Sequence, residues 1–233
     1  ALPIARHMPS AEMSPPARLA SIQERVAHAA KPARRSPADV TLIAVSKTHP
    51  AHAITPLLAA GQRDFGENRV QEAQEKWPAL REQWPETRLH LIGQLQSNKA
   101  AEAVTLADAI HAVDRPSLVS ALAKAMDTQG KRPACFIQVN IGAEPQKGGC
   151  AIEELPALLA AARVAELPLA GLMCLPPADV EPAPYFALLA KLARDHGLAG
   201  LSMGMSGDFE TAVLLGATHI RVGSALFGAR ASK

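Results

Sequence analysis

Aromatic side chains are scarce in this chain, at 3% of its 233 residues. Proteins that hold single-stranded nucleic acid stack the bases on aromatic rings, so this scarcity argues against that class. The formal net charge of +2 is also too small for a surface that attracts polyanions. We therefore expect no nucleic-acid partner and favour a protein that handles a small molecule.

Cysteines and long apolar runs are also few. The three cysteines are too far apart for a CxxC pair and odd in number, which indicates reduced thiols. No apolar run reaches the roughly 20 residues of a membrane-spanning helix, and the first residues lack the hydrophobic stretch of a signal peptide. We expect a cytoplasmic protein without a membrane partner.

The sequence begins ALPIARHM, and we interpret residues 1–7 as a cloning remnant. We expect residues 1–13 to form a disordered N-terminal extension and residues 14–233 to form a single domain. With 48% hydrophobic and 20% charged residues, a chain of this length can bury the core of one α/β barrel.

Short apolar runs and helical segments alternate along the chain. A first helix is predicted after Ser14, which can cap it, with two prolines in the first turn. This helix and those between the runs have amphipathic spacing. The runs are typical of strands buried on both faces and cover residues 41–47, 64–68, 88–93, 109–114, 135–141, 169–175, 198–204 and 219–227. The pattern predicts an α/β fold of the (β/α)8 TIM-barrel type with an extra N-terminal helix. The alternative is a doubly wound open sheet, but no GxGxxG motif follows the first run.

Candidate site residues lie where the runs end, because barrel enzymes work at the carboxyl ends of their strands. Lys47 ends the first run and would present a nucleophilic amine at the barrel mouth, although it would also suit a lysine that reaches into solvent. Ser206 follows the seventh run, where it would bind phosphate or only cap the next helix. Gly223 and Ser224 end the eighth run in an RVGS sequence that suits close approach to a ligand or a simple turn.

These features gain weight together, because barrels often bind phosphate with the loops after strands seven and eight. A phosphate held there and an amine at Lys47 would be bridged by a flat phosphorylated aldehyde such as pyridoxal 5'-phosphate (PLP). Arg221 would then lie at the pyridine nitrogen.

Weaker candidates surround these residues. Glu67 and Asn68 end the second run, and we expect both to face the mouth, with Asn68 contacting the cofactor ring or capping a helix. His49 and His52 are interpreted as helix surface rather than metal ligands, so no metal site is expected. The QKGG segment at 146–149 is interpreted as a flexible loop over the mouth.

The motifs taken together resemble those of the YggS/PROSC family, the pyridoxal phosphate homeostasis proteins. They read AVSKTHP, FGENRVQEAQEKW, HLIGQLQSNK, QVNIGAEPQKGG, GLMCLPP, LSMGMSGDFETAV and RVGSALFGAR, and the resemblance extends from about Leu19 to Arg230. The resemblance implies a fold type III barrel, like the N-terminal domain of alanine racemase. It implies PLP on Lys47 as a Schiff base (a lysine aldimine), phosphate contacts at Ser206, Gly223 and Ser224, and Arg221 at the ring. Arg69 and Gly148 depart from the tyrosine and serine common in relatives.

Three function classes compete: a PLP-binding homeostasis protein without demonstrated turnover, a PLP-dependent amino-acid racemase, and a cofactor-free Schiff-base aldolase. A racemase needs a base on each face of its substrate. The only tyrosine, Tyr185, falls in the helix after the sixth run, which leaves His90, Asn68 and Cys174 as places to seek a second base. We favour the homeostasis protein, with no catalytic residue and with PLP-dependent apo-enzymes as candidate recipients of the cofactor.

Overall fold

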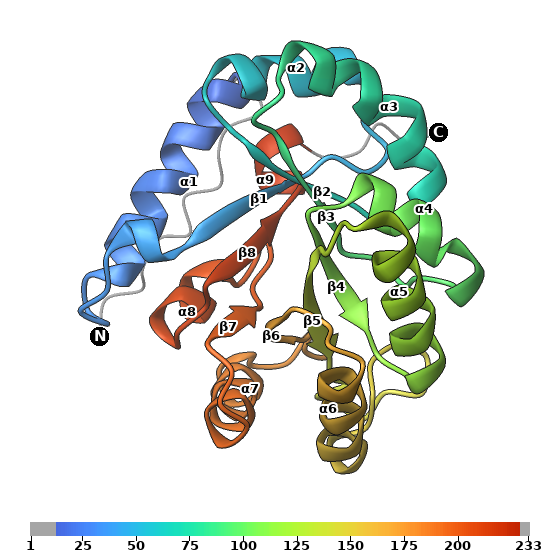
Figure 1. Cartoon of the computed structure of the whole chain (residues 1–233). Helices are drawn as coiled ribbons and strands as arrows, with labels where there is room; N and C mark the ends of the chain where they lie inside the picture. Colours follow the sequence, from blue (N-terminus) through green and yellow to red (C-terminus); the bar gives the residue numbers. More distant parts are fainter. Residues whose placement is uncertain (1–12, 229–233) are drawn as a thin grey trace.

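Eight parallel strands close into a barrel in sequence order, with β1 paired to both β2 and β8. The computed structural model describes residues 13–228. The strands are β1 Thr41–Val45, β2 Asp64–Glu67, β3 Arg88–Leu91, β4 Ala109–Val113, β5 Ala134–Gln138, β6 Leu169–Met173, β7 Gly200–Ser202 and β8 His219–Val222. The predicted (β/α)8 barrel is confirmed, and the open sheet is excluded (Figure 1).

Helices surround the barrel because their apolar faces cover its outer side. Within residues 13–228 they are α1 Pro15–Ala30, α2 Ala51–Ala59, α3 Val70–Gln83, α4 Ala100–Leu106, α5 Pro116–Gln129, α6 Leu155–Val164, α7 Ala183–Asp195, α8 Phe209–Leu214 and α9 Ser224–Phe227. Three short 3-10 turns complete the described part, at Pro37–Asp39, Ser97–Lys99 and Ile152–Glu154.

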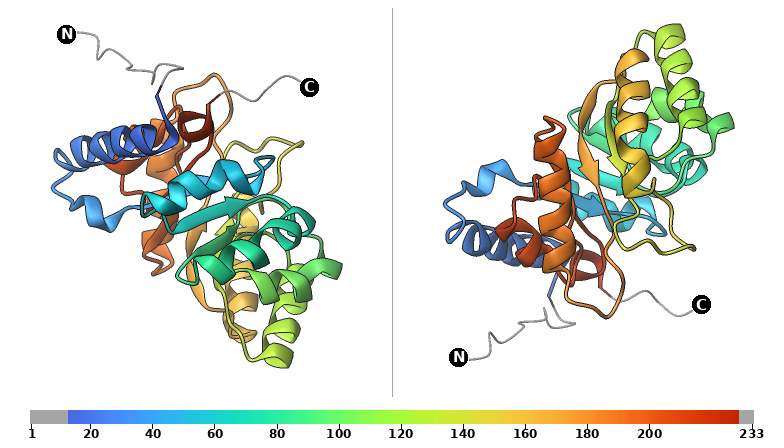
Figure 2. Two further views of the ribbon diagram at one scale, coloured as in Figure 1. Left: turned by 90° about the horizontal axis from the view of Figure 1, so that it is seen from above. Right: turned by 90° about the horizontal axis from the view of Figure 1, so that it is seen from below.

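The extra N-terminal helix is α1, and it begins as the sequence predicted. The Ser14 side chain accepts a hydrogen bond from the backbone N–H of Ala17 at 3.4 Å, and Pro15 and Pro16 occupy the first turn. Its buried face packs against α8 and α9, as both views in Figure 2 show. Apart from Met13, the expected extension over residues 1–13 lies outside the described residues.

Several strands are shorter than the predicted runs. β1 ends at Val45, so Lys47 lies in a turn two residues beyond the strand rather than at its end. Thr48 follows with φ of 66°, in the left-handed region, which turns the chain away from the sheet. The run 219–227 likewise divides into β8 and the short helix α9.

Residues on each strand alternate between the barrel interior and the surrounding helices. On β2, Asp64 and Gly66 point inward, whereas Phe65 and Glu67 contact Trp77 of α3. A Cβ atom at Gly66 would lie 2.9 Å from Ile43 Cγ2, so the crowded interior requires glycine here.

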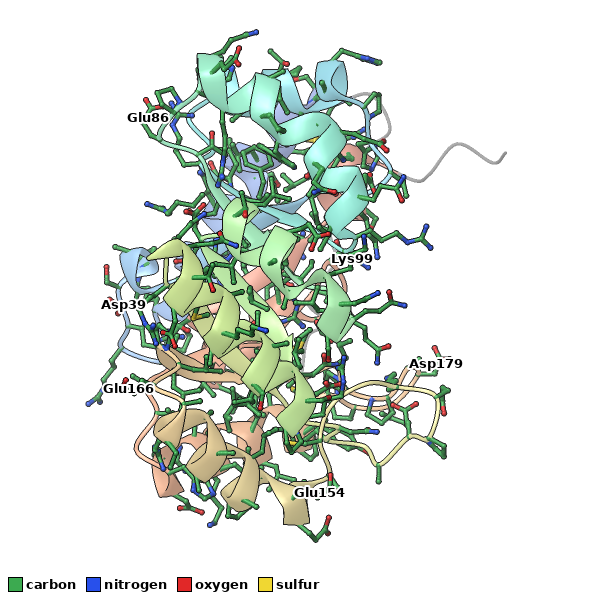
Figure 3. The ribbon with its side chains drawn as sticks, turned by 45° about the vertical axis from the view of Figure 1, so that its right-hand side comes forward. Asp39, Glu86, Lys99, Glu154, Glu166 and Asp179 are labelled. Carbon is green, nitrogen blue, oxygen red and sulfur yellow. The ribbon has the colours of Figure 1, made fainter. Side chains whose placement is uncertain are left out.

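The carboxyl ends of the strands form one end of the barrel. In Figure 3, Asp39, Glu86 and Glu166, which precede strands, lie on one side of the molecule, whereas Lys99 and Asp179, which follow strands, lie on the other. In the part of the chain that the structure describes, no helix combines the length and apolar character needed to span a membrane.

Candidate functional site

A cavity of about 840 Å³ opens at the carboxyl ends of the strands. All six predicted site residues line it, although they come from four separate loops, strand β8 and the first turn of helix α9: Lys47, Asn68, Ser206, Arg221, Gly223 and Ser224. The barrel closure brings them together, because β8 pairs with β1 and places the last loops beside the first. A cavity of this size is typical of a small-molecule or cofactor site.

A buried ion pair holds the turn that carries Lys47. Lys76 on α3 places its Nζ 2.7 Å from Glu67 Oε1. The same ammonium donates hydrogen bonds to the carbonyl oxygens of Ser46 at 2.9 Å and His49 at 3.1 Å. These carbonyls lie on either side of Lys47, so one cation fixes both ends of the turn.

Two carboxylates complete this clamp. Glu67 accepts a hydrogen bond from Ser46 Oγ at 2.6 Å and another from Trp77 Nε1 at 3.1 Å. Glu72 Oε1 accepts a hydrogen bond from the backbone N–H of Thr48 at 2.5 Å. Burial alone would raise the pKa of Glu72, but its hydrogen bonds from Lys76 and Thr48 outweigh burial and lower that pKa.

The prediction that Glu67 faces the mouth is wrong. Its side chain is fully buried on the outer side of β2, against α3, while Asn68 lines the cavity. The physical reason is the two-residue period of a strand: Asp64, Gly66 and Asn68 share the inward side, and Glu67 takes the opposite one.

Ser206 joins the two loops that follow β7 and β8. Its Oγ accepts hydrogen bonds from the backbone N–H groups of Gly223 and Ala225, both at 3.3 Å. It does not cap the helix after β7, as one interpretation had it, because α8 begins three residues later with Asp208 at its N-cap. Beside it, Gly207 has open space where a Cβ would lie, so a ligand can approach the backbone.

Arg221 forms the floor of the cavity and is 3% exposed. Its Nη1 donates to Ser202 Oγ at 2.6 Å, and its Nη2 donates to the carbonyl oxygen of Cys174 at 2.9 Å. Burial lowers the pKa of Arg221 to about 10, so the guanidinium still carries its charge at neutral pH.

Two residues of the cavity wall were missed or undervalued from the sequence. His49 lines the cavity and stacks on Phe227 of α9, with ring centroids 4.3 Å apart, whereas His52 is exposed on α2 as expected. Lys147, in the loop predicted over the mouth, donates to the carbonyl oxygen of Pro176 at 2.9 Å. The position of His49 two residues after Lys47 was the available signal.

The described residues contain no cluster of three or more histidine, cysteine or acidic side chains suited to a metal ion. The three cysteines are free thiols and buried. Burial raises the pKa of each to about 12, which keeps them protonated and unreactive.

Fold and site together define a barrel of the alanine racemase type, with a lysine, an arginine and paired serine loops around one cavity. Residues 18–231 match the family described as alanine racemase, N-terminal domain. The chain is 42% identical over 227 residues to the pyridoxal phosphate homeostasis protein of Pseudomonas aeruginosa, covering 91% of this chain and 94% of that protein. The corresponding protein of Escherichia coli K12 is 39% identical over 235 residues, covering 91% and 95%.

Among solved structures, PipY of Synechococcus elongatus PCC7942 with PLP bound is similar, with a TM-score of 0.81 and 39% identity over 92% of this chain and 100% of that one. The chain belongs to the family of pyridoxal phosphate homeostasis proteins. The resemblance inferred from the motifs is thereby confirmed.

Proposed function

We propose that this protein binds PLP in the cavity at the barrel mouth and serves PLP homeostasis, holding the cofactor without turnover. The observation that carries the proposal is the convergence of Lys47, Arg221 and the Ser206 loop on one cavity. When bound, PLP would supply an electrophilic aldehyde carbon, and Lys47 would hold the cofactor there through its side-chain amine.

The donor set around Ser206 suits a phosphate group. Two backbone N–H groups occupy the acceptor positions of Ser206 Oγ, so its own O–H proton is directed to another acceptor. An anionic phosphate oxygen accepts such a proton well. The hydroxyl of Ser224 and the backbone at Gly223 line the same part of the cavity and complete the proposed phosphate site.

Arg221 is proposed to face the pyridine nitrogen of the cofactor, with Asn68 in polar contact with the ring. A guanidinium can only donate hydrogen bonds, and it keeps its protons at neutral pH. The ring nitrogen therefore remains an acceptor, which makes the ring a weaker sink for electrons than a carboxylate partner would. This arrangement supports retention of the cofactor over catalysis.

The candidates for a second base do not support the racemase alternative, and Asn68, which lines the cavity, carries an amide that is not basic. Tyr185 lies on α7 and is not among the residues that line the cavity within residues 13–228. His90 is buried inside the barrel and bonded to Asp64 and His111. Cys174 is buried, and burial raises its pKa to about 12. The group is therefore a protonated thiol at neutral pH and cannot act as a base.

A visible absorption spectrum before and after borohydride reduction, followed by peptide mapping, tests the proposal. We expect a visible band that reduction removes, with the label on Lys47. Lys47→Ala should abolish the band, whereas Lys147→Ala, which removes another lysine of the cavity wall, should retain it. A label on Lys147 or Lys99, or the absence of any band after incubation with PLP, would contradict the proposal.

Cofactor delivery to PLP-dependent apo-enzymes is part of the same proposal, and the buried reduced thiols accord with a cytoplasmic location. The loaded protein is mixed with an apo-enzyme and a reagent that reacts with aldehydes and so removes free PLP from solution. Activation of the apo-enzyme in its presence distinguishes direct transfer from release into solution. Activation that resists this reagent supports direct transfer.

A further inference from the structure

A continuous line of hydrogen bonds runs through the barrel interior below the cavity. Arg221 Nη1 donates to Ser202 Oγ at 2.6 Å, and Ser202 Oγ lies 2.8 Å from His111 Nδ1. His111 Nε2 lies 2.9 Å from His90 Nδ1, and His90 Nε2 lies 2.9 Å from Asp64 Oδ1. The five side chains come from β2, β3, β4, β7 and β8. We call them the core chain.

The core chain spans the barrel from the cavity to the opposite end. At its far end, Arg88 donates to both carboxylate oxygens of Asp64, at 2.8 and 2.6 Å, and its own side chain is 61% exposed. His111 and Ser202 in the middle are fully buried. Interior positions of such barrels are usually filled by branched apolar side chains. Burying polar side chains there costs free energy of desolvation, so we looked for a function of the core chain.

The two ends of the core chain set the direction of every bond in it. Arg221 can only donate, and an ionised Asp64 can only accept. Burial alone would raise the pKa of Asp64, but hydrogen bonds from Arg88 and His90 outweigh it and lower that pKa to about 2, so the carboxylate is ionised at neutral pH.

The single arrangement that satisfies all donors has both histidines neutral with their protons on Nε2. Ser202 then gives its proton to His111 Nδ1, His111 gives to His90 Nδ1, and His90 gives to Asp64. Burial lowers the pKa of His111 well below its usual range, which agrees with a neutral ring. Phe136 stacks on the His111 ring at 4.4 Å and holds its plane.

The reverse direction fails at Ser202. If His111 carried its proton on Nδ1, Ser202 Oγ would accept from both neighbours and its own proton would need another acceptor. Within residues 13–228 the Ser202 hydroxyl has no other hydrogen-bond partner, and the residue is fully buried. A buried donor without an acceptor is costly, so the observed geometry selects the first direction.

We propose that the core chain positions Arg221, and that His111, His90 and Ser202 are thereby positioning residues for the ligand contact at the cavity floor. The line of aligned donors ends in a carboxylate and holds the guanidinium by its Nη1, while Arg221 lines the cavity. This inference rests on the proposed function, in which Arg221 meets the pyridine nitrogen of PLP.

Two measurements test the inference separately from the proposed function. In the protein without cofactor, 15N NMR of the imidazole rings should show His111 and His90 as Nε2–H tautomers near neutral pH. A proton on Nδ1 of His111, or a doubly protonated His90, would refute the proposed direction of the hydrogen bonds in the core chain, whether or not PLP binds.

The second measurement compares PLP with a phosphorylated 2-hydroxybenzaldehyde that has the same substituents but no ring nitrogen. His111→Phe keeps an aromatic ring against Phe136 but removes the hydrogen bonds to Ser202 and His90 from the core chain. The control is His219→Phe, since the His219 ring lies 5.9 Å from that of His111 in the same layer but outside the chain.

We expect His111→Phe to reduce the preference for PLP over the carbocyclic analogue by about tenfold, the effect of misplacing one charged hydrogen bond. His219→Phe should leave that preference unchanged. An equal loss of affinity for both ligands in His111→Phe would show a merely structural role and overturn the inference. Failure of the wild-type protein to bind PLP would instead refute the proposed function. The histidine tautomers measured without cofactor would still test the core chain.

Discussion

Lys76 offers the sharpest test of how the Lys47 turn is held, because one ammonium contacts Glu67, Glu72 and two backbone carbonyls. Lys76→Met keeps most of the stem but removes the charge. The Glu67 side chain has no exposed surface and that of Lys76 is 12% exposed, so the variant leaves a buried carboxylate without its cation. Breaking such a pair costs about 3–5 kcal/mol of unfolding free energy. We expect about 3 kcal/mol, since water can reach the slightly exposed Lys76 position.

Urea unfolding at neutral pH measures this loss. Lys124→Met is the matched control, because Lys124 is exposed on a helix and the same change there should cost less than about 0.5 kcal/mol. The double variant Glu67→Gln/Lys76→Met should recover part of the loss, because no buried charge is then left uncompensated. Equal stabilities of Lys76→Met and Lys124→Met would refute the reasoning, as would a double variant whose loss is the sum of the two single losses.

The same variant should weaken PLP binding. Two hydrogen bonds to the carbonyls of Ser46 and His49 disappear, so the turn that presents Lys47 is less well ordered before binding. A loss of about 1.4 kcal/mol corresponds to roughly tenfold weaker affinity. The affinity is measured by titrating the visible band with PLP in the absence of urea, at a temperature well below the melting transition. Unchanged affinity would limit the clamp to a stabilising role.

Three further predictions concern separate parts of the molecule. Ser206→Ala removes a donor to the phosphate and should weaken PLP binding by roughly 10- to 100-fold, whereas Ser36→Ala, a cap of a distant 3-10 turn, should leave it unchanged in the same titration. Burial lowers the pKa of His219 to about 4 from 6.5, so the unfolded chain binds a proton that the folded one refuses. Unfolding free energy should therefore fall as pH drops from about 6.5 to 4, and His219→Phe should flatten that slope by up to about 1.4 kcal/mol per pH unit. The native protein should not react with a thiol reagent at pH 8, and unfolding should release three reactive thiols, from Cys135, Cys150 and Cys174; rapid labelling of the native protein would contradict their burial.

Much of the site could be predicted from local sequence. Lys47 ends one apolar run, Ser206 follows another, and the RVGS segment holds Arg221, Gly223 and Ser224 together. Because parallel strands in a barrel all end at one face, knowing where each run stops was enough to place these residues around one cavity. The helix after Ser14 was equally accessible, since its cap, its prolines and its apolar face are all local signals.

The direction of individual side chains required the tertiary structure. Glu67 and Asn68 are neighbours at the end of β2, but one contacts α3 and the other lines the cavity, because a shift of one residue changes the side of the sheet. The apolar run alone does not set that parity when the strand is buried on both faces.

The core chain shows the same division more clearly. Asp64, His90, His111, Ser202 and Arg221 are spread over most of the chain, and each alone reads as an isolated polar residue in an apolar run. Local sequence determined that strands would form there and that a lysine, an arginine and two serines would meet at their ends. Only closure of the barrel decided that these five side chains face one another inside it, because contact between them depends on strand register and on the pairing of β8 with β1.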